Sequence, residues 1–206
     1  GTHVFVDPTP VAEKRWTKEE NARVQDCLRR QEDFMRNPVN RKAFESWLSR
    51  FENLRSQPLP VQLEVVNDSI NQTIKYEHDI KIHKVEEHFA APSESAVTLR
   101  IGDCEDYAIL KYAVMRWLGV SSGRLCVASV ASDSTKGGFD HGVLLVDLSP
   151  CGDGSEVVVL DNDGGTPMPL GETPYRPEFA TTETGVKKIH RRSEERRVGK
   201  ECRSRW

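Results

Sequence analysis

Three residues of this chain have the types that nucleophilic catalysis requires, although they lie far apart in the sequence: Cys104, His141 and Asp161. Cys104 opens an apolar segment, so we expect it at a helix N-terminus, where unpaired N–H groups and a partial positive charge favour the thiolate. His141 begins one strand-like segment and Asp161 ends the next, so neighbouring antiparallel strands could place them together. The set fits a nucleophile, a base and an orienting carboxylate. The residues alone also allow a buried structural cysteine, a surface histidine and a turn aspartate.

Carboxylates crowd the candidate nucleophile. Asp103, Glu105 and Asp106 all lie within two residues of Cys104. Negative charge beside a thiol raises its pKa and opposes formation of the thiolate. A bound hard cation would reverse the local charge, and calcium takes several carboxylate and carbonyl oxygens. The same carboxylates could instead cap the helix N-terminus, where acidic residues are common.

The elements that must position these residues follow from the apolar spacing. A capping-box pattern with Thr17 as N-cap predicts a first helix over about 18–35, which Asn37-Pro38 would end. A second, amphipathic helix is expected over about 40–54. Pro60 suits the first turn of a third helix.

The segment 104–118 has little polar surface, so we expect a central, buried helix that Gly119 terminates. Three runs rich in Val and Leu follow, separated by Gly, Ser and Asp, and these predict an antiparallel meander at 125–131, 141–148 and 156–161. The order predicts an α+β fold, in which N-terminal helices and a central cysteine-bearing helix pack on an antiparallel sheet.

Composition limits the classes of function. The chain has 206 residues, a formal net charge of −3, 37% hydrophobic and 30% charged residues, which suits one globular domain and argues against disorder. No basic patch points to nucleic acid, and no apolar run is long enough to span a membrane. Residues 1–10 lack a basic start followed by an apolar core, so we expect any signal peptide to be absent or already removed.

The last fifteen residues, 192–206, read RSEERRVGKECRSRW and resemble the translation of a common sequencing adapter. They show no apolar periodicity, and the alternative is a natural basic tail. We therefore expect one domain over 1–191, followed by a read-through artefact that is not natural protein. Without that segment the formal net charge is −6.

Several motifs resemble one protein family. The sequence GDCEDYA at 102–108, followed by Lys111-Tyr112, is similar to the signature of the bacterial transglutaminase-like cysteine peptidases, whose best-known members are the LapG-type periplasmic proteases. The sequences DHGVL at 140–144 and LDN at 160–162 resemble the second and third motifs of that family. Further likenesses lie upstream, at Val66-Asn67, Asn71, Tyr76, Asp79, Trp47 and Leu54. The resemblance covers roughly 47–169, and the cysteine motif is its most specific part.

This resemblance implies a papain/transglutaminase-like fold with a triad of Cys104, His141 and Asp161. It also implies a calcium ion (Ca2+) at the residues matching Asp103 and Glu105. LapG-type members clip a large surface adhesin near its N-terminus and so release biofilm cells, and a membrane-bound cyclic-di-GMP receptor sequesters them. The resemblance therefore implies a periplasmic, calcium-dependent cysteine endopeptidase with a protein substrate.

Two departures from the family pattern lie where substrate could bind. Phe89 stands near a position that is usually Trp, and Gly142 follows the histidine where the family usually has Met. Neither change touches the triad, so they bear on adhesin specificity more than on chemistry.

Two other functions stay open on the same residues. The same triad could transfer an acyl group to an amine, as the transglutaminase-like fold allows, or the fold could serve a non-catalytic binding protein. In either catalytic case the Cys104 N–H would supply part of an oxyanion hole, with the Asn67 side chain as a candidate second donor.

Overall fold

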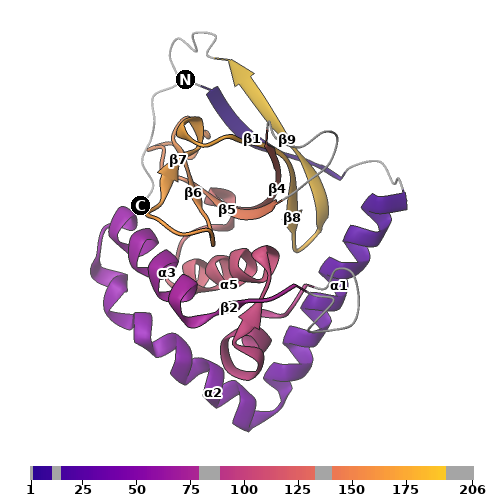
Figure 1. The fold of residues 1–206 in the computed structure, drawn as a ribbon, viewed down its shortest axis with the longest axis vertical. Helices are drawn as coiled ribbons and strands as arrows, with labels where there is room; N and C mark the ends of the chain where they lie inside the picture. The colour runs from indigo at the N-terminus through magenta and orange to yellow at the C-terminus, as the bar shows by residue number, and fades with distance from the viewer. Residues whose placement is uncertain (1, 11–14, 79–88, 133–140, 194–206) are drawn as a thin grey trace.

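The computed structural model describes residues 2–10, 15–78, 89–132 and 141–193 (Figure 1). Asp79 and Asp140, which contribute to the resemblance, lie outside the described residues, as does 194–206. The helices are α1 (Arg15–Arg36), α2 (Pro38–Leu48), α3 (Leu59–Thr73) and α5 (Cys104–Trp117), with a 3-10 segment at Ser49–Ser56 and a π-helical turn at Glu94–Leu99. Within the described ranges, no helix is both long and apolar enough to cross a membrane.

Seven strands form one sheet, in the order β1-β9-β8-β4-β5-β6-β7. Their bounds are β1 Thr2–Pro10, β4 Leu125–Ser132, β5 His141–Asp147, β6 Val157–Leu160, β7 Met168–Pro169, β8 Tyr175–Thr182 and β9 Gly185–Ser193. Every pairing in this sheet is antiparallel. A separate parallel pair joins β2 (Lys75–Tyr76) to β3 (Ile101–Gly102) directly before α5. The predicted α+β architecture and the meander β4-β5-β6 are confirmed.

The central strands are buried on both faces, which explains their nearly continuous Val and Leu composition. Along β5, Leu144 and Val146 face the helices and pack in one core with Leu110 of α5. Val143 and Leu145 alternate to the opposite face and pack in a second core under the curled sheet. The sheet therefore holds α5 on one side and closes over its own apolar core on the other (Figure 1).

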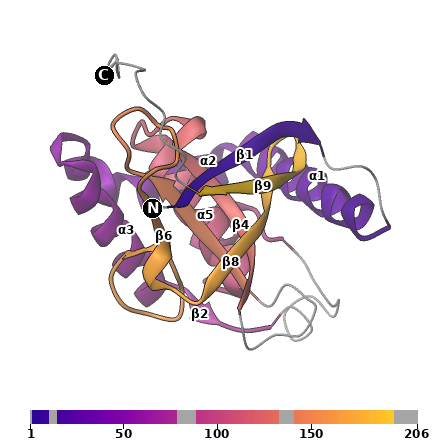
Figure 2. The same ribbon diagram turned by 90° about the horizontal axis from the view of Figure 1, so that it is seen from above.

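The outer helices flank this arrangement on two sides. In both views, α3 lies on the side of β6 and α1 lies beside the β8–β9 hairpin (Figures 1 and 2). A hydrogen bond fixes the second contact, because the Val186 N–H of β9 donates to Asn21 Oδ1 of α1 at 2.7 Å. Helix α5 is thus enclosed, as predicted from its apolar sequence.

Two predicted helix boundaries are wrong. Helix α1 begins at Arg15, so Thr17 lies inside it and is not the N-cap. The capping-box pattern is only a local preference, and Arg15-Trp16 contains nothing that breaks a helix. The second helix begins at Pro38, where the Asn37 side chain accepts hydrogen bonds from two backbone N–H groups, and its last turns are a 3-10 helix.

Four of the seven strands in the sheet were not predicted, namely β1, β7, β8 and β9. Strands β1, β8 and β9 carry more polar residues than the meander, so their alternation is weak. The predicted boundary after residue 191 falls inside β9, since Arg192 and Ser193 pair with His3 and Thr2 of β1. That 192–206 is an adapter artefact stays a prediction.

Candidate active site

The start of α5 is held by a buried aspartate. Asp106 is 1% exposed, and its two carboxylate oxygens accept from the backbone N–H groups of Ala90 at 2.7 Å and Asp103 at 3.0 Å. This folded-back side chain leaves no room at Gly102, where an added Cβ would lie 2.7 Å from Asp106 Cβ. The glycine and second aspartate of the GDCED motif therefore serve to build the helix start.

Cys104 is the first residue of α5, as predicted, and its sulfur has two close polar partners. The Gly142 N–H donates to Cys104 Sγ at 3.3 Å, which brings the start of β5 against the helix N-terminus. The thiol donates to Glu105 Oε2 at 3.3 Å. Burial, followed by the negative charge of Glu105, raises the thiol pKa far above its usual value, while the Gly142 N–H acts in the opposite direction.

His141 and Asp161 meet as the meander predicts. His141 Nε2 lies 2.6 Å from Asp161 Oδ1. Burial lowers the pKa of His141, but the hydrogen bond and charge of Asp161 outweigh it, and the net shift is upward. Burial likewise opposes ionisation of Asp161, but its hydrogen bonds to His141 and Tyr175 bring its pKa down to about 2. The Asp161 carboxylate therefore favours the protonated form of the imidazole over the neutral one.

Tyr175, at the start of β8, is a site residue that the sequence did not reveal. Its hydroxyl donates to Asp161 Oδ2 at 2.6 Å. Its ring lies 5.5 Å from the His141 ring, between centroids. One side chain thus contacts both members of the pair, and no motif marked it because β8 itself was not predicted.

The loop that carries Asp161 is tied to α3 through two asparagines of the upstream family segment. Asn71 Nδ2 donates to the Asp161 carbonyl at 2.8 Å, and Asn67 Nδ2 donates to the Gly165 carbonyl at 3.2 Å. Asn67 is therefore a loop-holding residue here, and the structure gives no support to its expected role as oxyanion donor.

The donor set beside Cys104 fits a hard cation. Asp103 is mostly buried, Glu105 lies against the sulfur, and both carry the oxygen ligands that calcium prefers. Asp103 also takes part in a capping box with Asp106, so the capping interpretation is satisfied by the same carboxylate. A second group of ligand atoms, from His141, Asp161 and Asp163, lies within 4.8 Å of one another. Negative charge thus surrounds the thiol and histidine.

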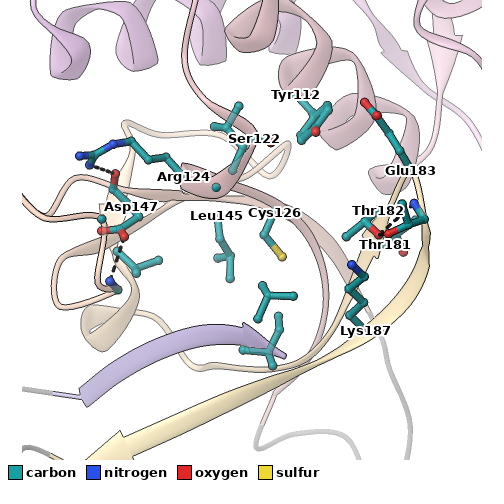
Figure 3. A pocket seen from close by; sticks show the side chains of 18 of the residues that line it. Tyr112, Ser122, Arg124, Cys126, Leu145, Asp147, Thr181, Thr182, Glu183 and Lys187 are labelled. Atoms are coloured by element: carbon teal, nitrogen blue, oxygen red, sulfur yellow. Dashed lines mark hydrogen bonds between the residues drawn. The ribbon is translucent and has the colours of Figure 1, made fainter. Parts of the chain in front are cut away.

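A cavity of about 530 Å3 lies elsewhere, at the other end of the sheet (Figure 3). Cys126 and Leu145 line its interior, with Arg124, Asp147 and Lys187 around them. It contains none of Cys104, His141 and Asp161, so it is not the candidate active site.

Known proteins of one family resemble this chain in sequence and in fold. Residues 41–187 match the family model of the bacterial transglutaminase-like cysteine proteinases. Calcium-bound LapG of Legionella pneumophila is 27% identical, with a TM-score of 0.59 over 80% of this chain and 87% of that one. The EGTA-treated form of the same protein is 28% identical, with a TM-score of 0.58 over 80% and 84%. No curated protein sequence matches the chain.

The family match covers more than half of the chain and includes all the residues assembled around Cys104. The structural matches extend the agreement over most of the described sheet and helices. The chain therefore belongs to the bacterial transglutaminase-like cysteine proteinases and is a cysteine peptidase of the LapG type.

Proposed function

We propose that this protein is a calcium-dependent cysteine endopeptidase in which Cys104, His141 and Asp161 act as nucleophile, base and orienting carboxylate. The observation that carries the proposal is the contact of the α5 N-terminus with β5 at Cys104 Sγ, because it brings the nucleophile to the strand that begins with His141. The α5 N-terminus presents Cys104, β5 supplies the Gly142 N–H at 3.3 Å, and His141 beside it is held by Asp161 at 2.6 Å. This is the arrangement that generates and uses a thiolate.

The chemistry proceeds in two halves. His141 takes the thiol proton, and Cys104 Sγ attacks the peptide carbonyl while the carbonyl oxygen becomes an oxyanion that the Cys104 N–H can stabilise. Collapse breaks the C–N bond, and His141 gives its proton to the leaving amine. Water, deprotonated by His141, then attacks the thioester and releases Cys104 and the second product. Asp161 keeps the imidazole oriented throughout.

Asp103 and Glu105 would hold the calcium ion. When bound, it supplies positive charge beside the thiol, where two carboxylates otherwise oppose ionisation. The calcium-bound and EGTA-treated structures of Legionella pneumophila LapG support calcium binding in this chain by similarity.

The substrate and setting are extended from the family resemblance. We propose that the enzyme acts in the periplasm, that it cleaves a large surface adhesin near its N-terminus in control of biofilm release, and that a membrane cyclic-di-GMP receptor sequesters it. The 27% identity to LapG across 80% of the chain supports this substrate class. The described residues include no membrane-spanning helix.

A product assay tests the reaction type. The purified chain is incubated with the N-terminal region of a repeat adhesin, with and without an excess of a primary amine, and the products are weighed by mass spectrometry. We expect two peptides whose new carboxyl end is free in both cases. An amine adduct at that end would show acyl transfer instead. If the wild-type chain neither cleaves nor reacts with a thiol-directed probe, while remaining folded, it is a binding protein and the proposal fails.

A further inference from the structure

Lys111 is a charged side chain buried beneath the active site. It lies on α5, seven residues after Cys104, so it projects from the same side of the helix two turns on. The residue is 0% exposed, and within the described residues its Nζ has no hydrogen-bond partner. The nearest ring, that of Tyr107, has its centroid 5.8 Å from Nζ. Burying an ammonium without partners is costly, so this position needs an explanation.

Three amide oxygens around the Asp161 loop have the matching problem. Asn67 Oδ1, Asn71 Oδ1 and Asn162 Oδ1 are buried and, among the described residues, none has a hydrogen-bond partner. The amide nitrogens of Asn67 and Asn71 already hold this loop through the carbonyls of Gly165 and Asp161. The three oxygens therefore lie where α3 meets the Asp161 loop.

The donors and acceptors are complementary in number. A lysine ammonium has three N–H donors, and three amide oxygens await donors. Helices α3 and α5 pack in the same core. Burial lowers the pKa of Lys111 to about 7, and the negative charge of Asp161 acts in the opposite direction. Buried water commonly links such groups, since each buried water molecule makes about three hydrogen bonds to polar atoms that otherwise lack partners.

We propose that buried water joins the Lys111 ammonium to the side-chain oxygens of Asn67, Asn71 and Asn162, and that this network fixes the loop that carries Asp161. Lys111 is then a positioning residue, which acts on the reaction through Asp161 and His141 and does not touch the substrate. The α5 helix, whose first residue is the nucleophile, thus also anchors the loop that carries the orienting carboxylate. The effect on activity rests on the proposed function, whereas the network itself does not.

A crystal structure of the wild-type protein at high resolution tests the network directly. We expect water density within about 3.2 Å of Lys111 Nζ and of at least two of the three asparagine oxygens. Density that shows an apolar, dry surround for Nζ would overturn the proposal, whatever the protein cleaves.

Variants test the consequence. Lys111→Met keeps the length and removes the charge, and Lys42→Met, on the exposed face of α2, is the matched control. We expect Lys111→Met to lower kcat about tenfold with an unchanged KM. The melting temperature should also fall, because the three asparagine oxygens lose the donor that the network supplies. An unchanged kcat, or a rise in KM alone, would contradict the positioning role.

A double-mutant cycle with Asn162→Ala completes the test, because the side-chain nitrogen of Asn162 forms no hydrogen bond with the residues that the structure describes. If the two side chains share one network, the kcat of the double variant is about the same as that of the less active single variant. Effects that multiply would show independent sites. The same cycle measured on thermal unfolding needs no peptidase activity, and Lys111→Gln, which keeps an amide donor, replaces Lys111→Met if that variant does not fold.

Discussion

Two regions of this molecule each contain a buried cysteine, and only one of them is equipped for chemistry. Cys104, at the start of α5, and Cys126, in β4, are both 8% exposed. Cys126 lines a cavity of about 530 Å3 (Figure 3), and burial raises its pKa to about 12. Cys104 does not line that cavity, but it has the Gly142 N–H, a helix N-terminus and the His141–Asp161 pair.

The electrostatics of the two sites make the comparison sharper. Burial is the cause of the raised pKa at Cys126, whereas at Cys104 the charges of Glu105 and Asp103 add to burial. By charge alone Cys104 is thus the harder thiol to ionise. The difference teaches that the nucleophile cannot be recognised by the described cavity, which it does not line, or by electrostatics that favour the thiolate. Its partners mark it, and the excess of carboxylates around it is what a cation would offset.

The largest expected effect is the loss of peptide cleavage when Cys104, but not Cys126, is replaced. Cys104→Ala should lower peptide cleavage by about 10^4-fold or more, because the nucleophile is removed, while circular dichroism shows the native fold. Cys126→Ala is the matched control, and it should keep activity while losing about 1 kcal/mol of stability. Cleavage that survives Cys104→Ala would show that the thiol beside His141 is not the nucleophile.

Calcium should act on one of these sites only. Because it binds the native state, calcium at a hundredfold excess over its Kd should add about 2.7 kcal/mol of stability, which corresponds to roughly 5–10 °C in Tm for a domain of this size. Chelation should lower both Tm and activity, and Asp103→Ala or Glu105→Ala should remove that response. If the chelator changes neither quantity, the two carboxylates are helix caps and no more.

Acid should weaken the histidine end of the site. The pKa of Asp161 falls from 3.8 to about 2 on folding, so its contribution is present above pH 4 and is lost as the pH falls toward 2. At neutral pH this contribution is about 2 kcal/mol, because each pKa unit corresponds to 1.36 kcal/mol. Urea titrations of the wild type and Asp161→Asn should therefore differ at pH 6 and converge near pH 2. Parallel curves over that range would show that Asp161 is not paired.

Tyr175 offers a finer test of the same end. Tyr175→Phe removes the hydroxyl that donates to Asp161 at 2.6 Å and keeps the ring against His141. We expect kcat/KM to fall about tenfold, since one hydrogen bond to a charged group is worth roughly 1.5–3 kcal/mol and the His141 contact persists. Tyr112→Phe, on α5 away from Asp161, is the control. Equal losses in both variants would point to general destabilisation.

The smallest effect is expected from the C-terminal segment. Truncation after Ser193 should change neither activity nor Tm, because the described sheet remains complete. Truncation after Arg191 also removes two residue pairs between β9 and β1 and should cost more. If truncation after Ser193 lowers Tm by roughly 4 °C or more, which corresponds to about 1 kcal/mol, the residues after Ser193 pack on the domain.

What the sequence predicted well is what leaves a dense local pattern. The apolar run of α5, the cysteine at its start and the three Val-rich strands were identified because each is continuous in the chain. Tyr175 was missed because its role depends on a strand whose residues alternate only weakly. Thr17 was misplaced because a capping pattern cannot show whether the chain leaves the helix there.

Other residues stood out in the sequence, but their structural roles became clear only from the three-dimensional contacts. Asn67 and Asn71 stood out by their spacing, yet only the structure shows that they hold the Asp161 loop. Gly142 was a departure from the family pattern. An added Cβ there would lie 3.2 Å from Glu105 Cγ, so the glycine lets β5 approach the helix closely. Contacts between segments this far apart leave no periodic signal.

The pairing of β1 with β9 has a consequence for the order of folding. Phe5 pairs with His190, which is among the largest sequence separations that a chain of 206 residues allows. Closing so long a loop is costly in entropy, and the contact is repaid only after the intervening core exists. During synthesis, β1 precedes the other described strands and cannot pair with β9 until β9 has left the ribosome. The edge strand β1 is thus synthesised before the other described strands, but its pairing with β9 is among the last contacts to form.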